Sequence, residues 1–172
     1  MITGEKKLLR AWALYLPLGI RLQGAHEYTP PAINIAKLDI KTGAMDAPVP
    51  VDDGMEALSC SFKIYGYDVG MLTLLGLQAG LYSPEITVRQ AYRVGNADSG
   101  QVETLQGMIV SITPDPRPAT SLGEASVSVD MALSYYRQAV DGVETVCIIP
   151  EEFVRRINGV NVLGGLKKII RI

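Results

Sequence analysis

Side chains that could carry out acid–base chemistry are few and scattered in this sequence. His26 is the single histidine among 172 residues, and it stands in a turn-like segment without a partner motif. A general base needs a nucleophile or an orienting group within hydrogen-bond reach, so an isolated imidazole favours a surface residue over a catalytic one. Asp130 could be a buried catalytic acid, but a lone acid on a polar strand face more often faces water. We predict that the chain is not an enzyme.

Metal and phosphate sites are also poorly supported. The acids that could surround a calcium ion are Asp46, Asp52, Asp53 and Glu56. They lack the Asp-x-Asp-x-Asp-Gly spacing of an EF-hand loop, which favours a solvated or interface loop. Gly159, Gly164 and Gly165 lack the Gly-Lys-Ser/Thr ending with which a glycine-rich loop holds phosphate. The sequence predicts no metal and no cofactor.

The two cysteines, Cys60 and Cys147, each alternate with apolar neighbours in a predicted strand. Two cysteines so far apart form neither a zinc motif nor a disulfide framework. We interpret them as buried, reduced thiols, which is typical of a protein assembled in a reducing cytoplasm.

Composition limits the class of partner. The formal net charge is -2 and the pI is near 5.4, so the chain lacks the excess of basic groups with which proteins neutralise a polyanion. Stable nucleic-acid binding is therefore not expected. The mean hydropathy of +0.18 is high for a chain without a membrane span, which predicts that apolar surface is buried against other subunits. The length fits one domain.

The N-terminal segment does not predict a membrane helix. The longest apolar run, residues 11–20, is interrupted by Pro17 and is shorter than the roughly 20 residues that a spanning helix needs. Basic residues precede this run, as in a secretory signal, but Arg21 follows it directly. We predict a strand here and no stable membrane association.

The elements that would position a functional surface are mainly strands, and one of them is unusually long. Residues 124–138 alternate apolar and small polar side chains, which places the two kinds on opposite faces of a strand. The apolar face holds Ala125, Val127, Val129, Met131, Leu133 and Tyr135. The polar face holds Ser126, Ser128, Asp130, Ala132 and Ser134. At about 3.3 Å per residue such a strand is roughly 50 Å long, tall enough for the wall of a channel or large barrel.

A tight turn follows this strand. Asp141-Gly142 supplies the positive backbone angles of a two-residue type I′ turn, so the sequence predicts a long hairpin over residues 124–149.

The remaining patterns predict more strands, a central helix and two loops. Strands are predicted at 10–16 and 19–23 as a pair, at 33–41, at 56–65, and at 85–94 and 102–113 as a hairpin. In the strand at 56–65, the inward residues are Leu58, Cys60, Phe62 and Ile64. Helices are predicted at 67–78 and, shorter, at 150–158. The segments 42–54 and 113–123, rich in proline, glycine and acids, are predicted to be loops.

Several segments together resemble one family. They are GAMDAPV at 43–49, DDGMEAL at 52–58, SYYR at 134–137 followed by Asp141-Gly142, and INGVN at 157–161. In this order and spacing they resemble the major tail tube protein of contractile-tail phages, the FII type, and the related tube proteins of R-type bacteriocins. The resemblance covers roughly residues 30 to 165.

The resemblance implies a fold and a function. The implied fold is mainly β with one central α-helix, a tail-tube-type β-barrel or sandwich formed by a single domain over residues 1–172. Its long strands would join neighbouring subunits into a ring-shaped inner barrel, and hexameric rings would stack into a hollow tail tube. Through this tube DNA passes, or the tube itself pierces the target cell envelope.

The resemblance also implies partners and a location. The partners are further copies of the chain, the tail sheath, tape measure, baseplate and tail terminator proteins, and DNA in transit without specific binding. The location is the virion tail, assembled in the cytoplasm of the host bacterium.

Two sets of residues follow as candidate sites. The residues predicted to line the lumen are Ser59, Ser61, Lys63, Ser126, Ser128, Asp130 and Ser134. The residues predicted to contact a neighbouring subunit through the acidic loop at 42–54 are Met45, Asp46, Pro48, Val49, Val51, Asp52 and Asp53. The alternative is a monomeric β-barrel that binds an apolar ligand and places its apolar face around a cavity.

Overall fold

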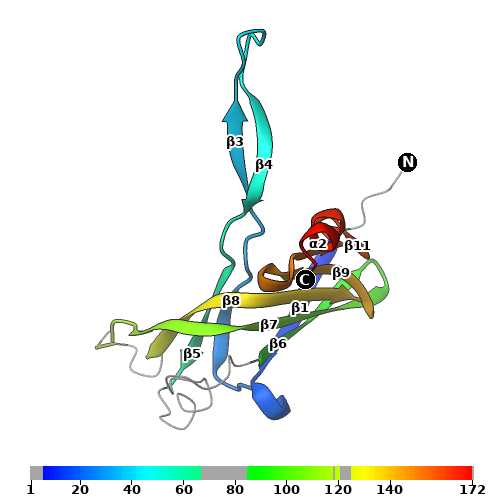
Figure 1. Cartoon of the computed structure of the whole chain (residues 1–172). Coiled ribbons are helices and arrows are strands. Elements are labelled where there is room, and N and C mark those ends of the chain that lie inside the picture. The colour runs from blue at the N-terminus through cyan, green and yellow to red at the C-terminus, as the bar shows by residue number, and fades with distance from the viewer. Residues whose placement is uncertain (1–5, 67–84, 118, 121–124, 172) are drawn as a thin grey trace.

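A computed structural model describes residues 6–66, 85–117, 119–120 and 125–171, and these residues form mostly antiparallel strands (Figure 1). The strands are β1 (Lys7–Tyr15), β2 (Ala25–Thr29), β3 (Ile35–Ile40), β4 (Val49–Met55), β5 (Ser59–Tyr65), β6 (Glu85–Val94), β7 (Ala97–Pro114), β8 (Ser126–Val140), β9 (Val143–Ile149), β10 (Val154–Ile157) and β11 (Val160–Asn161). The helical turns are η1 (Pro17–Gly19), η3 (Pro150–Glu152) and α2 (Gly164–Ile170). The central helix predicted at 67–78 lies outside the described residues.

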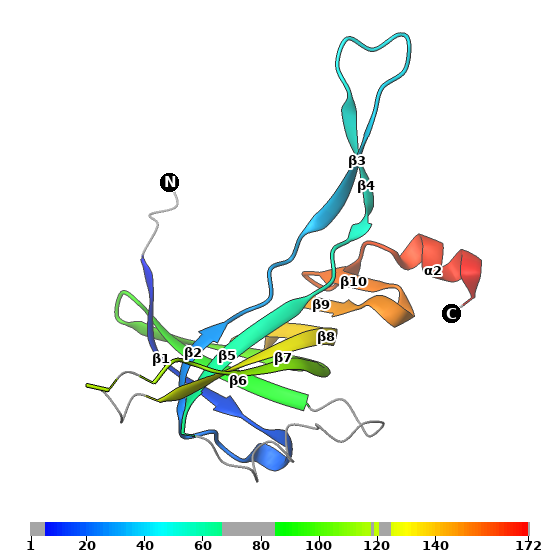
Figure 2. The ribbon, with the colours of Figure 1, turned by 90° about the vertical axis from the view of Figure 1, so that its left-hand side faces the viewer.

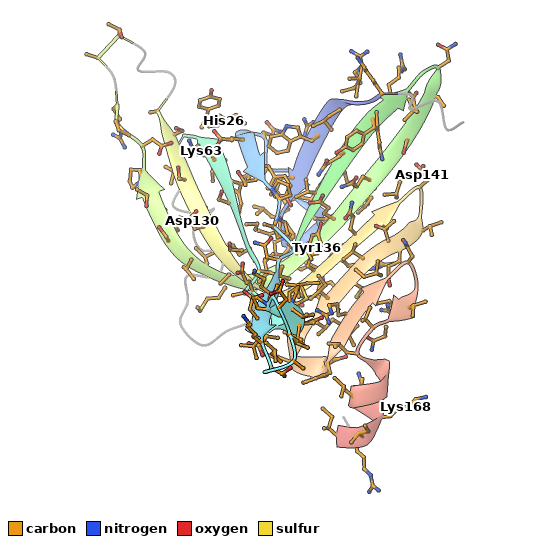
Figure 3. The ribbon with its side chains drawn as sticks, turned by 90° about the horizontal axis from the view of Figure 1, so that it is seen from above. His26, Lys63, Asp130, Tyr136, Asp141 and Lys168 are labelled. Atoms are coloured by element: carbon orange, nitrogen blue, oxygen red, sulfur yellow. The ribbon has the colours of Figure 1, made fainter. Side chains whose placement is uncertain are left out.

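Two long strands, β7 and β8, connect two arms of one sheet. In one arm the strand order is β1–β6–β7–β8–β9–β10–β11, and in the other β8 also pairs with β5, which pairs with β2. Seen from above, the two arms open as a V, with Tyr136 between them (Figure 3). Among the described residues the sheet does not close on itself, so the predicted barrel is an open, sandwich-like fold in the single chain.

The bend between the arms coincides with two β-bulges. Ser134 is an extra residue in β8, and Val110 is an extra residue in β7. A bulge bends its strand and shifts the alternation of side chains by one residue. Val127, Val129 and Met131 are buried before the bulge in β8, whereas Tyr136 is buried after it. The prediction of one uninterrupted apolar face ending at Tyr135 was therefore wrong beyond the bulge.

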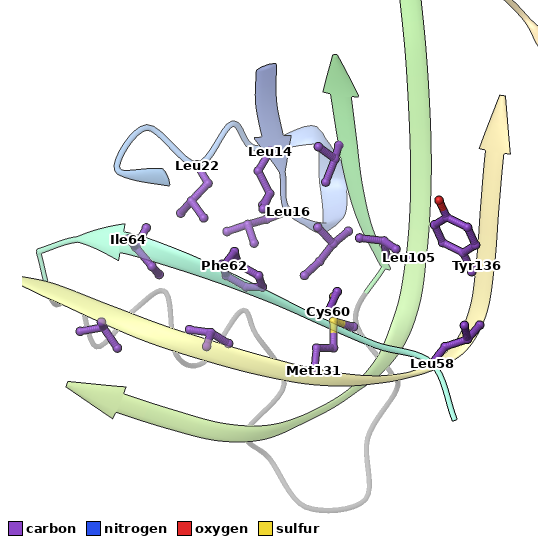
Figure 4. Packing of buried hydrophobic residues seen from close by; sticks show 14 of the residues in the cluster. Leu14, Leu16, Leu22, Leu58, Cys60, Phe62, Ile64, Leu105, Met131 and Tyr136 are labelled. Carbon is purple, nitrogen blue, oxygen red and sulfur yellow. The ribbon is translucent and has the colours of Figure 1, made fainter. Parts of the chain in front are cut away.

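The core fills the space between the arms. Leu14 from β1 and the buried residues of β6 belong to one cluster with Phe62 and Ile64 from β5 and Val129 from β8. Figure 4 shows Leu14 on one side of this cluster, and Phe62 and Ile64 on the other. The inward residues predicted for β5, which are Leu58, Cys60, Phe62 and Ile64, are all buried, as are both free cysteines. Strict alternation along β5 and the first half of β8 produces this packing, because one face of each strand is apolar.

One carboxylate is buried in the same space. Glu103 on β7 is 2% exposed and accepts hydrogen bonds from the Tyr28 hydroxyl and from the amides of Gln90 and Gln101. Burial, followed by the charge of Glu103, raises the pKa of Tyr28 far above its usual value, which keeps this phenol protonated as a donor. The network joins β2 to β6 and β7 across the V.

The long hairpin is confirmed at its turn. Asp141 and Gly142 have φ values of 49° and 82°, as a type I′ turn requires. The Asp141 carboxylate also accepts a hydrogen bond from the backbone N–H of Gly100 at 2.7 Å, which ties the turn to β7.

The β3–β4 hairpin, residues 35–55, leaves the body and projects away from it (Figures 1 and 2). The prediction of a loop over 42–54 was wrong from Val49 onward, because 49–55 is strand β4. Pro50 misled that prediction, although a two-stranded hairpin has edges on which proline is tolerated. At the base of the hairpin, Nη2 of Arg155 on β10 donates to Asp52 at 2.7 Å, and this hydrogen bond lowers the pKa of Asp52.

Two further sequence predictions were only partly correct. Residues 10–16 and 19–23 meet in one antiparallel bridge, Tyr15 with Arg21, and the backbone N–H of Leu22 donates to the carbonyl of Leu14 at 2.8 Å. The second segment forms no regular strand, because β1 pairs along its length with β6 and Pro17–Gly19 is a 3-10 turn. The helix predicted over 150–158 ends after its first turn, since Val154–Ile157 forms β10 against β9. Phe153 adopts a left-handed conformation, with φ of 53°, and reverses the chain between these two elements.

Candidate functional site: a polar face on four strands

A polar face covers the outer side of the arm formed by β7, β8, β5 and β2. Cross-strand pairing aligns its side chains in two rows, and each of the four strands contributes one side chain to each row. The first row is Thr113, Ser128, Lys63 and Glu27. The second row is Ser111, Asp130, Ser61 and Thr29. Directly opposed residues on antiparallel strands point to the same side of the sheet, so these eight side chains share one surface.

The structure brings together six of the seven residues that the sequence predicts for this face. Ser59, Ser61 and Lys63 of β5 lie beside Ser126, Ser128 and Asp130 of β8 in the paired register. The seventh residue, Ser134, is the bulged residue of β8, and its hydroxyl donates to the carbonyl of Gln106 at 3.4 Å. It therefore belongs to the bend and not to the face.

Sequence reasoning missed the contributions of β7 and β2. Ser111 and Thr113 alternate around Ile112 in β7, and Glu27 and Thr29 alternate around Tyr28 in β2, so the polar period was visible in each segment. Their membership of this face depends on strand pairing, which a single sequence does not give. The bulge at residue 110 also changes which side Ser111 faces.

Asp115 covers part of the polar face. Its carboxylate accepts hydrogen bonds from Ser126 at 2.6 Å and from Ser128 at 2.9 Å. These two hydrogen bonds lower the pKa of Asp115. The two serines therefore present a hydroxyl–carboxylate cluster to the solvent and not free hydroxyls.

Acids outnumber bases on this surface. Lys63 lies 3.3 Å from Glu27 in an ion pair, which leaves the charges of Asp115 and Asp130 in excess. Asp130 is exposed, as predicted for a solvated acid. The face is thus hydroxyl-rich with a net negative charge.

His26 sits at the end of this arm, near Lys63 (Figure 3). Its ring stacks on Tyr65 with a centroid separation of 3.8 Å, and its Nδ1 finds no hydrogen-bond partner among the described residues. A catalytic base would be oriented through that nitrogen, so the geometry gives His26 a packing role.

The described part of the chain contains no cluster of three or more histidine, cysteine or acidic side chains suited to a metal ion. Within the same residues, no helix has the length and apolar character needed to cross a membrane.

The residues predicted to contact a neighbour all lie on the projecting β3–β4 hairpin. Met45, Asp46 and Pro48 lie in the tip between the two strands. The others, Val49, Val51, Asp52 and Asp53, belong to β4. Only Asp52, at the base, is held by the body of its own chain, through Arg155. The side chains of the other six residues are exposed to solvent.

The described strands thus form an open sheet with one packed face and one polar face. The chain matches the model of the phage tail tube protein FII family over residues 7–170. The match spans nearly the whole sequence, so the chain belongs to this family.

Solved structures support the same fold. The chain is similar to one in the sheath–tube complex of PVC, an extracellular contractile injection system in the extended state, with 10% identity, a TM-score of 0.58, and coverage of 74% of this chain and 87% of that chain. It is also similar to a chain of the anti-feeding prophage tube terminating cap, with 12% identity, a TM-score of 0.57, and coverage of 81% and 97%. No curated protein matches it.

The chain is therefore a structural tail tube protein of a phage or phage-like contractile tail, and it is not an enzyme. This confirms the family, the mainly β fold class and the structural tail tube role that the sequence predicts.

Proposed function

We propose that six copies of this chain form a ring whose inner wall is the polar face, and that such rings stack into a hollow tube. The observation that carries this proposal is the four-strand arm itself, which has a buried apolar face, a polar outer face and unpaired edges. A surface of this kind suits the inside of a water-filled bore.

Ring closure follows from the edges of this arm. The second half of β7, from Gly107 to Pro114, pairs with β8 only, and β2 pairs with β5 only, among the described residues. Unpaired strand edges are templates for pairing with another chain, and a barrel closed between subunits removes them. A neighbour's edge on each side completes the hydrogen bonding of both strands.

The electrostatics of the face suit transport without binding. Phosphate backbones are retained by lysine and arginine, whereas the excess charge here comes from Asp115 and Asp130. DNA, or another anionic cargo, would slide along hydroxyl groups and be repelled by the carboxylates.

The proposal extends to the other tail components. The similar structures come from a sheath–tube complex, a sheath/tube terminator and a baseplate, and we assign corresponding partners to this chain, together with a tape measure protein. Assembly takes place in the host cytoplasm, where the two buried thiols stay reduced.

The alternative, a monomeric barrel around an apolar ligand, has less support. Its apolar face would surround a cavity, whereas the apolar face of this arm packs against Leu14, Ile86 and Val88 of the other arm.

Cryo-electron microscopy of the concentrated protein tests the proposal. We expect rings or tubes with the side chain of Asp130 directed into the bore. Monomers under every salt and protein concentration, or a tube with Asp130 on its outside, would overturn it.

A further inference from the structure

Two elements of the chain are largely uncovered by the described remainder of it. The β3–β4 hairpin has no fully buried residue in either strand, and α2 has none among its seven residues. An isolated two-stranded hairpin is marginally stable in water, and so is a helix shorter than about 12 residues. Each element therefore needs a surface to pack against.

The hairpin carries a defined apolar stripe. Leu38 pairs with Val51, and Ile40 pairs with Val49, so the four side chains share one face of the ribbon. Their exposed fractions are 51%, 46%, 41% and 49% in that order. The opposite face is polar and includes the ion pair between Lys37 and Asp39. One side of the hairpin is thus built for burial, and nothing described in the same chain covers it.

The helix carries a matching stripe. Leu166, Ile169 and Ile170 stand at positions i, i+3 and i+4, which form one face of a helix. They are 54%, 76% and 49% exposed.

In the described part of the chain, the unpaired charges of the hairpin are two acids, Asp46 and Asp53, and one base, Lys41, whereas those of α2 are basic. Asp46 and Asp53 on the hairpin form no ion pair with another described residue, and neither does Lys168 on α2. The segment 35–55 contains four aspartates and two lysines, whereas 164–170 contains two lysines and no acid. The apolar stripe of the hairpin, with a net acidic charge beside it, is therefore complementary to the apolar stripe of α2, with its basic charge.

The partner of each stripe must come from another copy. Within one chain α2 borders a groove of about 780 Å³, which is lined by the base of the hairpin and by residues of the body such as Leu133 and Ile148. Leu166 lines this groove, whereas Ile169 and Ile170 do not. The stripe pairs, Leu38 with Val51 and Ile40 with Val49, lie nearer the tip than the hairpin residues that line this groove. The hairpin itself projects beyond α2 (Figure 2). We propose that the hairpin of one copy packs its apolar stripe on α2 of a second copy, with Asp46 or Asp53 beside Lys168.

This contact joins two different patches, and in the head-to-tail arrangement of a tube it is not exchanged reciprocally between two copies. A heterologous contact of this kind continues from copy to copy and generates a ring or a filament. The inference rests on the proposed function, since it names the contact through which tube subunits are joined.

Cysteine cross-linking tests the contact in assembled protein. The native cysteines are buried, so a Val49→Cys, Ile169→Cys double variant adds the accessible thiols. After mild oxidation of its tubes, we expect a ladder of covalent multimers on a non-reducing gel. Each single variant should give dimers at most. A control that pairs Ile169→Cys with Met108→Cys, an exposed residue of β7, should give no ladder.

Three results would overturn the contact. One is tubes without a ladder, and another is a cross-link confined to single chains. The third is a ladder of equal yield in the Met108 control. Failure of the unmodified protein to form rings or tubes would refute the proposed function, and this contact with it.

Charge reversal provides a second test. Lys168→Glu should raise the protein concentration needed for assembly by roughly two- to fivefold, because an attractive contact becomes repulsive. Adding Asp46→Lys and Asp53→Lys should restore assembly. A triple variant as impaired as Lys168→Glu would refute the pairing.

Discussion

The register of β8 is tested most directly by two adjacent threonine substitutions. Val129 is fully buried in the core, whereas its neighbour Ser128 points to the polar face and donates to Asp115. Val129→Thr replaces one methyl group with a hydroxyl of nearly the same size. Ser128→Thr retains the hydroxyl and adds a methyl group toward solvent.

The expected costs differ strongly. At Val129 the variant loses about 0.8 kcal/mol of apolar burial and buries a hydroxyl that lacks a partner, at about 1–3 kcal/mol. A total of about 2–4 kcal/mol lowers the Tm of a domain of this size by roughly 4–16 °C. At Ser128 the change in stability should stay within about 0.5 kcal/mol, which is a shift in Tm of less than about 2 °C.

The assay is thermal unfolding of both variants and the parent at one protein concentration, because assembly also shifts the Tm. Equal losses in the two variants would contradict the assignment of opposite faces. A larger loss for Ser128→Thr would mean that β8 is one residue out of register and that the polar face is the packed one.

Three other perturbations have defined outcomes. Gly107→Ala would place a Cβ 2.0 Å from the carbonyl oxygen of Ala132, so it should destabilise the protein severely in urea unfolding, while Gly100→Ala on the same strand, with its nearest contact at 4.0 Å, should not. The pKa of Asp115 is lowered in the folded state. The ionised carboxylate therefore stabilises the fold fully at a pH above its pKa in the unfolded chain, about 3.9, and this stabilisation is lost as the pH falls through its lower pKa in the folded protein. In Asp115→Asn the free energy of unfolding should fall less steeply with decreasing pH below about pH 4 than in the parent. An unchanged dependence on pH would refute the stabilising role of Asp115. Burial, followed by the charges of Glu103 and Asp130, raises the pKa of Cys60 to about 12, so a thiol reagent should modify it only after unfolding.

The sequence predicted those strands that are specified by the residues of the strand and its turn alone. β5 and the first half of β8 alternate strictly, and Asp141-Gly142 specifies its own turn, so these elements and their inward residues were predicted correctly. The same reasoning placed six of the seven face residues, because a period of two is a property of each strand alone.

The features that the sequence could not predict depend on strand pairing and on the neighbours of each residue in space. Nothing local indicates that β1 pairs with β6, or that Ser111 and Thr29 lie in one row with Asp130 between them. Ser134 resembles any other serine in an alternating strand, and its bulge results from how β7 and β8 fit together. The strand β4 was missed because its proline and acids are tolerated where both edges of a hairpin face solvent.

The two bulges also limit how this chain can change in length. The pairing of β7 with β8 shifts by one residue at Ser134 and shifts back at Val110, so both ends of the strand pair keep the same register. Deleting either residue alone would displace one end and turn its core residues toward the solvent. Deleting both would keep the ends aligned while removing the causes of the bend. Insertions and deletions in these strands should therefore survive selection only as matched pairs, and loss of such a pair would change the angle between the arms.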